Sequence, residues 1–338
     1  PQGAALDIGH PVLALHPAMQ PLLQFWNAGE FAIVHAVGSP ATLSRTRSHF
    51  EAQEVWERCG LQSTTFNGWI GRHLDSDPQA GQVLSGVAKE QRLWSTFEGY
   101  SQSLAISNIY NFDVFGFSDS VAARGALSSL HSGSGLLENQ GAATLAGVNT
   151  LDSIDFGALP PRNGAVYPNE SFAREMDQIA RLIKADVGVR AVAVDIGGWD
   201  QHNDMGPPVP GERAYDRISR LAMGLEAFLV DMGNDMNEIT LLAVSEFGRT
   251  INVNGNGGTD HGRGGAALAF GKGVNGGVYG GFPGVIEDGP EGDLEVLNDF
   301  RKIYGELVVN RLGNGANVTQ VLNGWTDPEP SWGMFAPS

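Results

Sequence analysis

Side chains of the types that bind metals or transfer protons border three short apolar segments in the second half of the chain. The apolar segments, 192–196, 239–244 and 266–270, are rich in Val, Ile, Leu or Ala, as buried strands of an α/β sheet are. In open α/β sheets ligands bind beyond the carboxyl ends of the strands, so acids and imidazoles that follow a strand are placed for chemistry. The candidates are Asp200, His202, Glu246, Arg249, Asp260 and His261.

Asp200 and His202 are two positions apart in the sequence. In an extended segment, residues i and i+2 point to the same side, so this carboxylate and imidazole would converge on one point. We expect His261 to supply a third metal ligand and Asp260 a further one, and such a set of ligands suits Zn or Mn. The alternative is that Asp260 forms a turn after the glycine pair at 257–258 and that His261 is an ordinary loop residue.

Glu246 follows the apolar segment 239–244 almost directly, and a carboxylate at that point needs a cation. Two interpretations stay open. Either Glu246 enters the crevice as a metal ligand, or it is buried as an ion pair with Arg249. Arg249 and Arg263 are also candidates for binding an anionic group in this acidic chain.

A second candidate region lies at residues 45–58. Ser48 followed by Glu51 matches a capping box and predicts a helix over 49–58. A hydroxyl at a helix N-terminus is also where an anion is favoured, so Ser48 could be the N-cap and a nucleophile at once. His49 would be a general acid or an added metal ligand, while Arg47 and Arg249 would neutralise an anionic substrate.

The frame for these residues is predicted from apolar periodicity and from glycine and proline positions. The predicted elements are helices over 17–29, 169–184 and 211–232, a strand over 31–37, a glycine-rich loop over 271–284 and a closing helix over 298–312. Two consecutive helix–strand repeats lead into the strands at 192 and 239, which predicts a parallel sheet with right-handed crossovers. We therefore expect one α/β domain over 1–338, with a doubly wound, mostly parallel sheet and an irregular insertion or cap at 61–168.

Composition excludes several classes of partner. The chain has 338 residues, of which 42% are hydrophobic and 17% charged, as in a soluble globular protein. Its net charge of -17 argues against nucleic acid and anionic membrane surfaces, because like charges would meet. Cys59 is the single cysteine, so neither an internal disulfide nor a multi-cysteine zinc site can form. No run of about 18 apolar residues would span a bilayer.

Four blocks together resemble a known family: Arg47-Ser-His-Phe50, Gly197-Gly-Trp-Asp-Gln-His202, Ser245-Glu-Phe-Gly-Arg-Thr250 and Gly257-Gly-Thr-Asp-His-Gly262. They look like the signature blocks of the bacterial family called domain of unknown function 1501, and the resemblance runs from about residue 16 to 312. This family is usually placed in the alkaline phosphatase and sulfatase superfamily, and its members often carry a twin-arginine export signal.

The resemblance implies an alkaline phosphatase-like doubly wound fold with metal ions at the carboxyl edge of the sheet. Asp200, His202 and His261 would hold one metal. Glu246 would replace the acid of the superfamily's Asp-His pair, and Ser48 would stand at the position of its nucleophile. Phe247 stands where the superfamily has a histidine of its second metal, and the superfamily's first strand would lie before Pro1.

We therefore expect a metal-dependent hydrolase or transferase that acts on phosphate or sulfate esters, with an anionic small molecule or glycan ester as substrate. The expected location is the periplasm or the cell exterior, after removal of a twin-arginine signal. The alternative is a non-catalytic cell-envelope protein that keeps the fold for binding or assembly, with an envelope protein or a second copy of the chain as partner.

Overall fold

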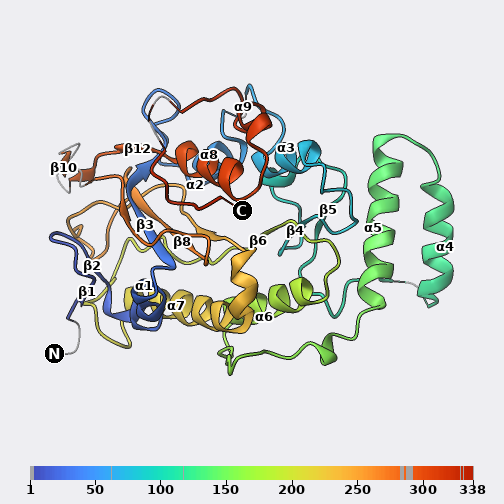
Figure 1. Cartoon of the computed structure of the whole chain (residues 1–338), viewed down its shortest axis with the longest axis horizontal. Coiled ribbons are helices and arrows are strands. Elements are labelled where there is room, and N and C mark those ends of the chain that lie inside the picture. The colour runs from blue at the N-terminus through green and yellow to red at the C-terminus, as the bar shows by residue number, and fades with distance from the viewer. Residues whose placement is uncertain are drawn as a thin grey trace.

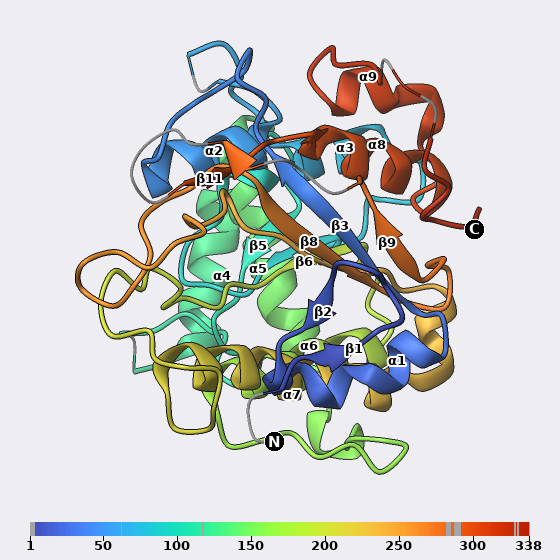
Figure 2. The same ribbon diagram turned by 90° about the vertical axis from the view of Figure 1, so that its left-hand side faces the viewer.

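Layers of helices enclose β-sheets in this chain. The computed structural model describes residues 4–61, 63–116, 118–281, 285–286, 292–327, 329 and 331–337. Helices α2, α3 and α8 cover one side of the strands, and α1, α6 and α7 cover the other (Figures 1 and 2). The α/β class and the helices on both faces are thus confirmed. Within the described residues, no helix has the length and apolarity needed to cross a membrane.

The helices are of very different lengths. They are α1 (Leu23–Asn27), α2 (His49–Arg58), α3 (Trp69–Ser76), α4 (Ser120–Leu130), α5 (Leu136–Asp152), α6 (Ser171–Lys184), α7 (Arg213–Met232), α8 (Phe300–Asn310) and α9 (Val318–Val321). The helix predicted over 17–29 is divided into a 3-10 helix, η1 (Pro17–Leu22), and α1. Pro21 lies inside η1, and a proline lacks the N–H that a continuous α-helix requires.

Within the described part of the chain, the strands form four separate sheets. The larger strands are β3 (Phe31–Gly38), β4 (Gly86–Ala88), β5 (Ser103–Ala105), β6 (Ala191–Ala193), β7 (Leu241–Ala243), β8 (Gly265–Phe270) and β9 (Gly277–Tyr279). The two-residue strands are β1 (Leu6–Asp7), β2 (Ala14–Leu15), β10 (Val285–Ile286), β11 (Asp293–Leu294) and β12 (Asn298–Asp299). A mixed sheet has the order β12-β3-β8-β7, with β9 also paired to β3, and a parallel sheet has the order β5-β4-β6.

Strand β3 connects the two hydrophobic cores because its successive side chains point to opposite faces. Ala32 and Val34 contribute to the core beneath α2 and α8, whereas Phe31 and Ile33 contribute to the core over α6 and α7. The register with β8 shifts near the end of β3, where Ala36 has a φ of 54°. This irregularity makes a β-bulge just before the chain reaches the 39–48 loop.

The strands predicted at 192 and 239 do not pair with each other. Strand β6 pairs in parallel with β4, whereas β7 pairs antiparallel with β8. The expectation of one mostly parallel sheet is therefore wrong for the sheet that contains β7. The reason lies in the connection: no helix separates β7 from β8, so the chain returns directly beside β7 in the opposite direction. The order of helices and strands along the chain does not indicate which strand each strand pairs with in the sheet.

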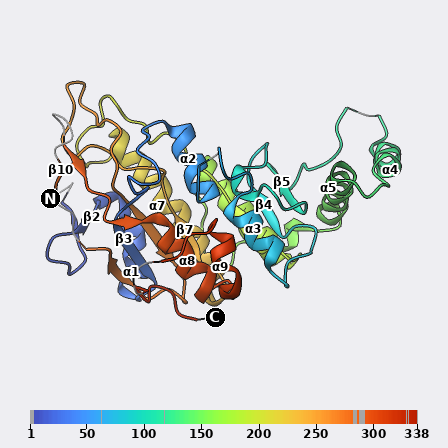
Figure 3. The ribbon, with the colours of Figure 1, turned by 90° about the horizontal axis from the view of Figure 1, so that it is seen from above.

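The segment 61–168 is more regular than predicted. It supplies β4 and β5 to the parallel sheet, and α4 and α5 form a helical pair at one end of the molecule (Figures 1 and 3). The description of this segment as irregular is therefore wrong, because short runs such as Ser103–Ala105 form strands only when paired with others. Its role as an insertion or cap stays a prediction.

The other predicted elements are found close to their expected bounds. Helices α6 and α7, strand β3 and helix α2 are confirmed, and the closing helix is α8. Part of the glycine-rich loop expected over 271–284 is strand β9. Residues 282–284 of that loop lie outside the described residues.

Replacement of Phe270 by alanine tests the shared core. This ring is 0% exposed and stacks on Phe31 with the ring centroids 4.2 Å apart. We expect Phe270→Ala to lower the free energy of unfolding by about 3–5 kcal/mol in urea titrations, because it leaves a cavity. Phe66, which is 79% exposed, is the matched control, and Phe66→Ala should change the free energy of unfolding by less than about 0.5 kcal/mol. Equal losses in the two variants would contradict this core.

A second variant tests how the helical pair is held. Arg124 of α4 forms ion pairs with Asp113 at 2.7 Å and with Asp152, at the end of α5, at 2.5 Å. We expect Arg124→Ala to accelerate amide hydrogen exchange in α4 several-fold and to leave exchange in α6 unchanged. The control is Arg220→Ala on α7, whose ion pair with Glu170 is long, at 3.5 Å. An unchanged rate of amide hydrogen exchange in α4 would show that the ion pairs of Arg124 do not hold α4 against α5.

Candidate metal centre

The loops after β6 and β7, the loop before β8 and the N-terminus of α2 meet at one place. One loop joins β7 to β8, and a β-bridge between Arg249 and His261 holds its two halves side by side. Gly258 lies against the loop that follows β6, where a Cβ atom would stand 2.2 Å from the carbonyl carbon of His202. Only glycine fits such a close approach of two backbones. Main-chain contacts thus bring together polar residues that are far apart in the sequence.

Three donor side chains form a group that could hold a metal ion. His49, Asp200 and His261 each offer one ligand atom, and these atoms lie within 4.8 Å of one another. His261 Nε2 is 2.9 Å from Asp200 Oδ1, and His49 Nε2 is 3.4 Å from Asp200 Oδ2. His49 Nε2 is buried and makes no hydrogen bond with a described residue. A buried imidazole nitrogen that faces a carboxylate and makes no hydrogen bond is chemically suited to bind a metal ion.

His202 lies beside this group and is held by Asp260. Its Nδ1 is 2.5 Å from Asp260 Oδ1, and its Nε2 is 2.8 Å from Asp200 Oδ1 and 3.0 Å from His261 Nε2. The hydrogen bonds with His202, first, and with Asn254 lower the pKa of Asp260, so that this carboxylate stays charged. The pairing fixes the orientation of the His202 ring. The expected ligands Asp200, His202 and His261 are therefore all brought together, with Asp260 behind His202.

Glu246 contacts His49. Its Oε1 lies 2.5 Å from His49 Nδ1, so Glu246 contacts an imidazole of the donor group. Its role as a metal ligand stays a prediction. No ion pair joins Glu246 to Arg249 within the described residues. The ring of Phe247 lies 4.9 Å from the rings of both His49 and His261, measured between centroids. Phe247 thus fills apolar space beside two of the three donors.

Arg249 contacts Asp200. Its Nη1 donates to Asp200 Oδ1 at 2.6 Å, and its Nε donates to the hydroxyl of Thr259 at 3.2 Å. Partial burial acts to raise the pKa of Asp200, but the hydrogen bonds from Arg249 and His261 outweigh it and hold that pKa well below its ordinary value. Asp200 is therefore a charged carboxylate at neutral pH, as a metal ligand must be.

Arg47 is paired with a buried acid. Its Nη2 donates to Asp293 Oδ2 at 2.8 Å, and the backbone N–H of Arg263 donates to the other oxygen of Asp293 at 2.7 Å. The side chain of Asp293 is 2% exposed and that of Arg47 41%. Asp293 thus connects the chain before α2 to the chain before β8. Arg47 and Arg249, both expected to bind an anionic substrate, each bind a carboxylate of the chain.

Ser48 is the N-cap residue of α2 by its backbone, but its side chain makes no capping hydrogen bond. The predicted capping box is therefore wrong: Glu51 accepts from the hydroxyl of Thr46 at 2.6 Å, and that same hydroxyl oxygen accepts from the Ser48 N–H at 3.1 Å. The hydroxyl of Ser48 is not hydrogen-bonded within the described residues. In the sequence Ser48 is directly followed by His49 of the donor group and directly preceded by Arg47. The carbonyl oxygen of Arg47 is 2.6 Å from Nδ1 of His261, another residue of that group.

Two residues that support the site carry no motif that would have singled them out: Asp293 and Asn254. Asn254 donates to Asp260 Oδ1 and to the carbonyl of His202, both at 3.1 Å. The side chain of Asp293 is 2% exposed, and a buried carboxylate needs a cation, which here is Arg47. The identity of that cation depends on the fold alone.

Asp293→Asn tests whether this acid holds the loop before α2. The amide keeps the size of the side chain but loses the charge that Arg47 needs, so we expect a loss of about 1–2 kcal/mol in the free energy of unfolding, since Arg47 is partly exposed. Glu295→Gln removes the same charge two residues away and should have little effect on urea unfolding. If the two variants unfold at the same urea concentration, Asp293 does not hold this loop.

Comparison with known proteins supports the resemblance seen in the sequence blocks. No curated protein and no solved structure matches the chain. Residues 161–298, which run from just before α6 to the start of β12, match the family described as protein of unknown function (DUF1501). The matched residues include Asp200, His202, Glu246 and His261, but not His49. This part of the chain is thus similar to the uncharacterised DUF1501 family.

Proposed function

We propose that His49, Asp200 and His261 bind a divalent metal ion, Zn or Mn, and that the protein is a metal-dependent hydrolase or transferase of phosphate or sulfate esters. The observation that carries the proposal is the group of three ligand atoms within 4.8 Å of one another, with the Nε2 atom of His49 buried and without a hydrogen bond to a described residue. Two imidazoles and one carboxylate are a common set of protein ligands for Zn, and they leave a position open for a further ligand.

The charge of the site supports a metal rather than an anion site made by the chain alone. Asp200, Glu246 and Asp260 surround the group, and Arg249 is the guanidinium in contact with it. Such an acidic site would repel an anionic ester unless a cation were bound. A divalent ion supplies that charge, and it also acts as a Lewis acid that lowers the pKa of a coordinated hydroxyl or water.

The neighbouring side chains hold the donors in place. Glu246 fixes the ring of His49, and the backbone carbonyl of Arg47 fixes that of His261. Carboxylates and carbonyls that contact the second nitrogen of a histidine set its tautomer and orientation, which is the usual support for a metal-binding imidazole. His202, held by Asp260, is placed to accept or deliver a proton beside Asp200.

Ser48 is the proposed nucleophile. It lies at the N-terminus of α2, a helix of ten residues, where the free N–H groups and the helix dipole favour an anionic group. Its hydroxyl is not engaged in capping, so it is available for attack on an ester. Arg249, already beside Asp200, would face the charge that develops on the substrate.

The rival proposal is a non-catalytic envelope protein that keeps this fold for binding or assembly. The contacts of Asp200 favour it, because Arg249, His202 and His261 already contact that carboxylate. Phe247 favours it as well, since an apolar ring lies against two of the three donors. The two proposals differ in the metal content that they predict: a metal centre binds an ion, whereas a structural cluster of polar side chains binds none.

The finer assignments belong to the same proposal. Helices on both faces of the sheets support a doubly wound fold of the alkaline phosphatase and sulfatase superfamily (Figure 1). We place the protein in the periplasm or outside the cell, with an anionic small molecule or glycan ester as substrate. Under the rival proposal the partner is an envelope protein or a second copy of the chain.

Metal content tests the proposal and separates its ligands from their neighbours. We expect about one equivalent of Zn or Mn in the purified protein by plasma mass spectrometry. His49→Ala should abolish metal retention, whereas His202→Ala should weaken affinity by about 10–100-fold, as expected for a residue that only supports a ligand. His10→Ala is the control histidine variant and should retain the metal fully. Folded wild-type protein that holds no metal would favour the rival.

Activity is tested with p-nitrophenyl phosphate and p-nitrophenyl sulfate. We expect turnover that chelators abolish, that added metal restores and that Ser48→Ala lowers at least about 100-fold. Ser44→Ala, in the preceding loop, is the matched control and should keep most of the activity. A metal-loaded protein that hydrolyses neither ester, or a Ser48→Ala variant with full activity, would contradict the proposed reaction.

A further inference from the structure

A cavity of about 250 Å³ lies at the opposite end of the mixed sheet from the candidate metal centre. Its wall includes Glu30, directly before β3, and Gly271 and Lys272, directly after β8. The first residue of β3, Phe31, pairs with the last residue of β8, Phe270. The metal centre, in contrast, is bordered by the loops at the start of β8 and after the end of β7. The cavity is therefore a separate site.

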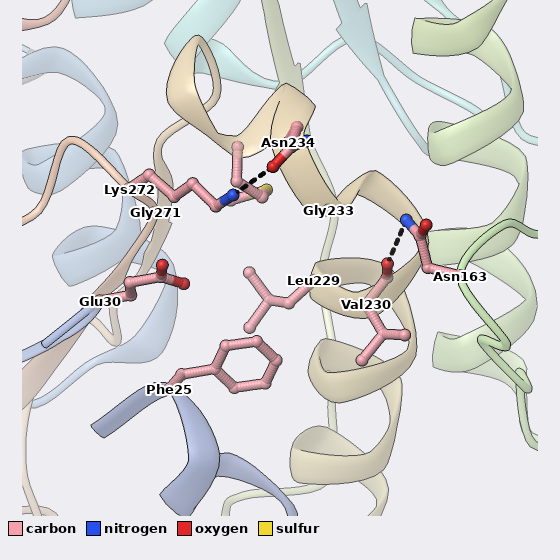
Figure 4. Close-up of a pocket in the computed structure, with 10 residues that line it drawn as sticks. Phe25, Glu30, Asn163, Leu229, Val230, Gly233, Asn234, Gly271 and Lys272 are labelled. Atoms are coloured by element: carbon pink, nitrogen blue, oxygen red, sulfur yellow. Dashed lines mark hydrogen bonds between the residues drawn. The ribbon is translucent and has the colours of Figure 1, made fainter. Parts of the chain in front are cut away.

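The cavity has an apolar floor. Phe25 of α1, Leu229 near the end of α7 and Met236 of the 3-10 helix η4 (Gly233–Asn237) line it, and Figure 4 shows the Phe25 and Leu229 side chains beside each other at its base. Its volume is just below the usual range for small-molecule sites, which begins at about 300 Å³. A single small molecule with an apolar part fits this description better than a peptide or a polymer.

Two opposite charges face the same space without meeting. The carboxylate of Glu30 makes no hydrogen bond or ion pair with a described residue. Lys272 Nζ donates to Asn234 Oδ1 at 2.6 Å, and it is not within the 4.0 Å of Glu30 that an ion pair requires. Figure 4 shows both side chains directed into the cavity from the same side. An acid and an amine that line one cavity and do not pair can each bind a charge of a ligand.

The end of α7 adds to the negative side of the cavity. Leu229 and Val230 belong to the last turn of this helix and line the cavity. The C-terminal end of a helix carries partial negative charge and favours a cation. The amide of Asn163 caps this end by donating to the Val230 carbonyl at 3.0 Å, which keeps the turn in place.

We propose that this cavity binds a free α-amino acid with an apolar side chain. Glu30 binds the ammonium group, Lys272 binds the carboxylate, and Phe25, Leu229 and Met236 contact the side chain. Glu30 would repel a simple anion, and Lys272 would repel a simple amine, which is a cation. A zwitterion carries both charges, so it can pair with both side chains at once. The site does not require the metal centre and is independent of the ester chemistry proposed above.

Calorimetric titration with L-leucine tests the proposal. We expect saturable binding to the intact chain at millimolar concentrations or below. L-leucine amide, which lacks the carboxylate, and 4-methylpentanoate, which lacks the ammonium group, should each bind at least about tenfold more weakly, because each leaves one protein charge unpaired. Glu30→Gln should weaken L-leucine binding by a similar factor, and it should reduce the penalty for 4-methylpentanoate.

The controls separate this site from the rest of the molecule. Lys272→Gln should weaken L-leucine binding and should improve the relative binding of the amide. Glu238→Gln, which removes a nearby exposed charge, and Asp200→Asn, which removes a donor of the metal centre, should leave L-leucine binding unchanged. Circular dichroism establishes that each variant is folded. Absence of saturable L-leucine binding to the folded wild-type chain, or equal binding of all three compounds, would overturn the proposal.

Discussion

The candidate metal centre depends on one carboxylate in an acidic chain. Asp200 contacts His202, Arg249 and His261, and it faces His49 at 3.4 Å, so side chains from three segments of the chain meet at this residue. A charged carboxylate surrounded in this way must be compensated by cations or donors. Arg249 supplies part of that compensation, and the proposed ion would supply the rest.

The sheet arrangement places these segments. Strands β6 and β7 belong to different sheets, and yet the loop after β6 meets the loop that joins β7 to β8. The β-bridge of Arg249 with His261 and the close approach of Gly258 to His202 show how this is achieved through the backbone. Short strands with apolar side chains, held between helix layers, thus fix loops that are themselves polar and glycine-rich.

The predictable part of this protein is the part set by local pattern. Helix α6 and helix α7 carry apolar residues every three or four positions, and His49–Arg58 forms the helix that its sequence predicts. The pairing of strands depends instead on contacts distant in sequence, so the antiparallel return of β8 beside β7 was not predictable from helix–strand order. The prediction of a capping box at Ser48 failed because another local residue takes its place. The hydroxyl of Thr46 donates to the Glu51 carboxylate and accepts from the Ser48 N–H.

The site shows the same division. Spacing indicates that Asp200 and His202 converge, and the positions of His261 and Glu246 beside the apolar segments add them to the same hypothesis. What spacing could not indicate was the position of His49, which is more than 150 residues from Asp200 in the sequence and yet belongs to the donor group, while His202 lies beside that group with Asp260. The most direct test of this account is X-ray absorption spectroscopy of the zinc-loaded protein. The account predicts two imidazole ligands and at least one oxygen ligand at about 2.0–2.2 Å in the wild-type protein, and no zinc bound at this site in His49→Ala. An unchanged zinc environment in that variant, or a protein that binds no zinc, would contradict it.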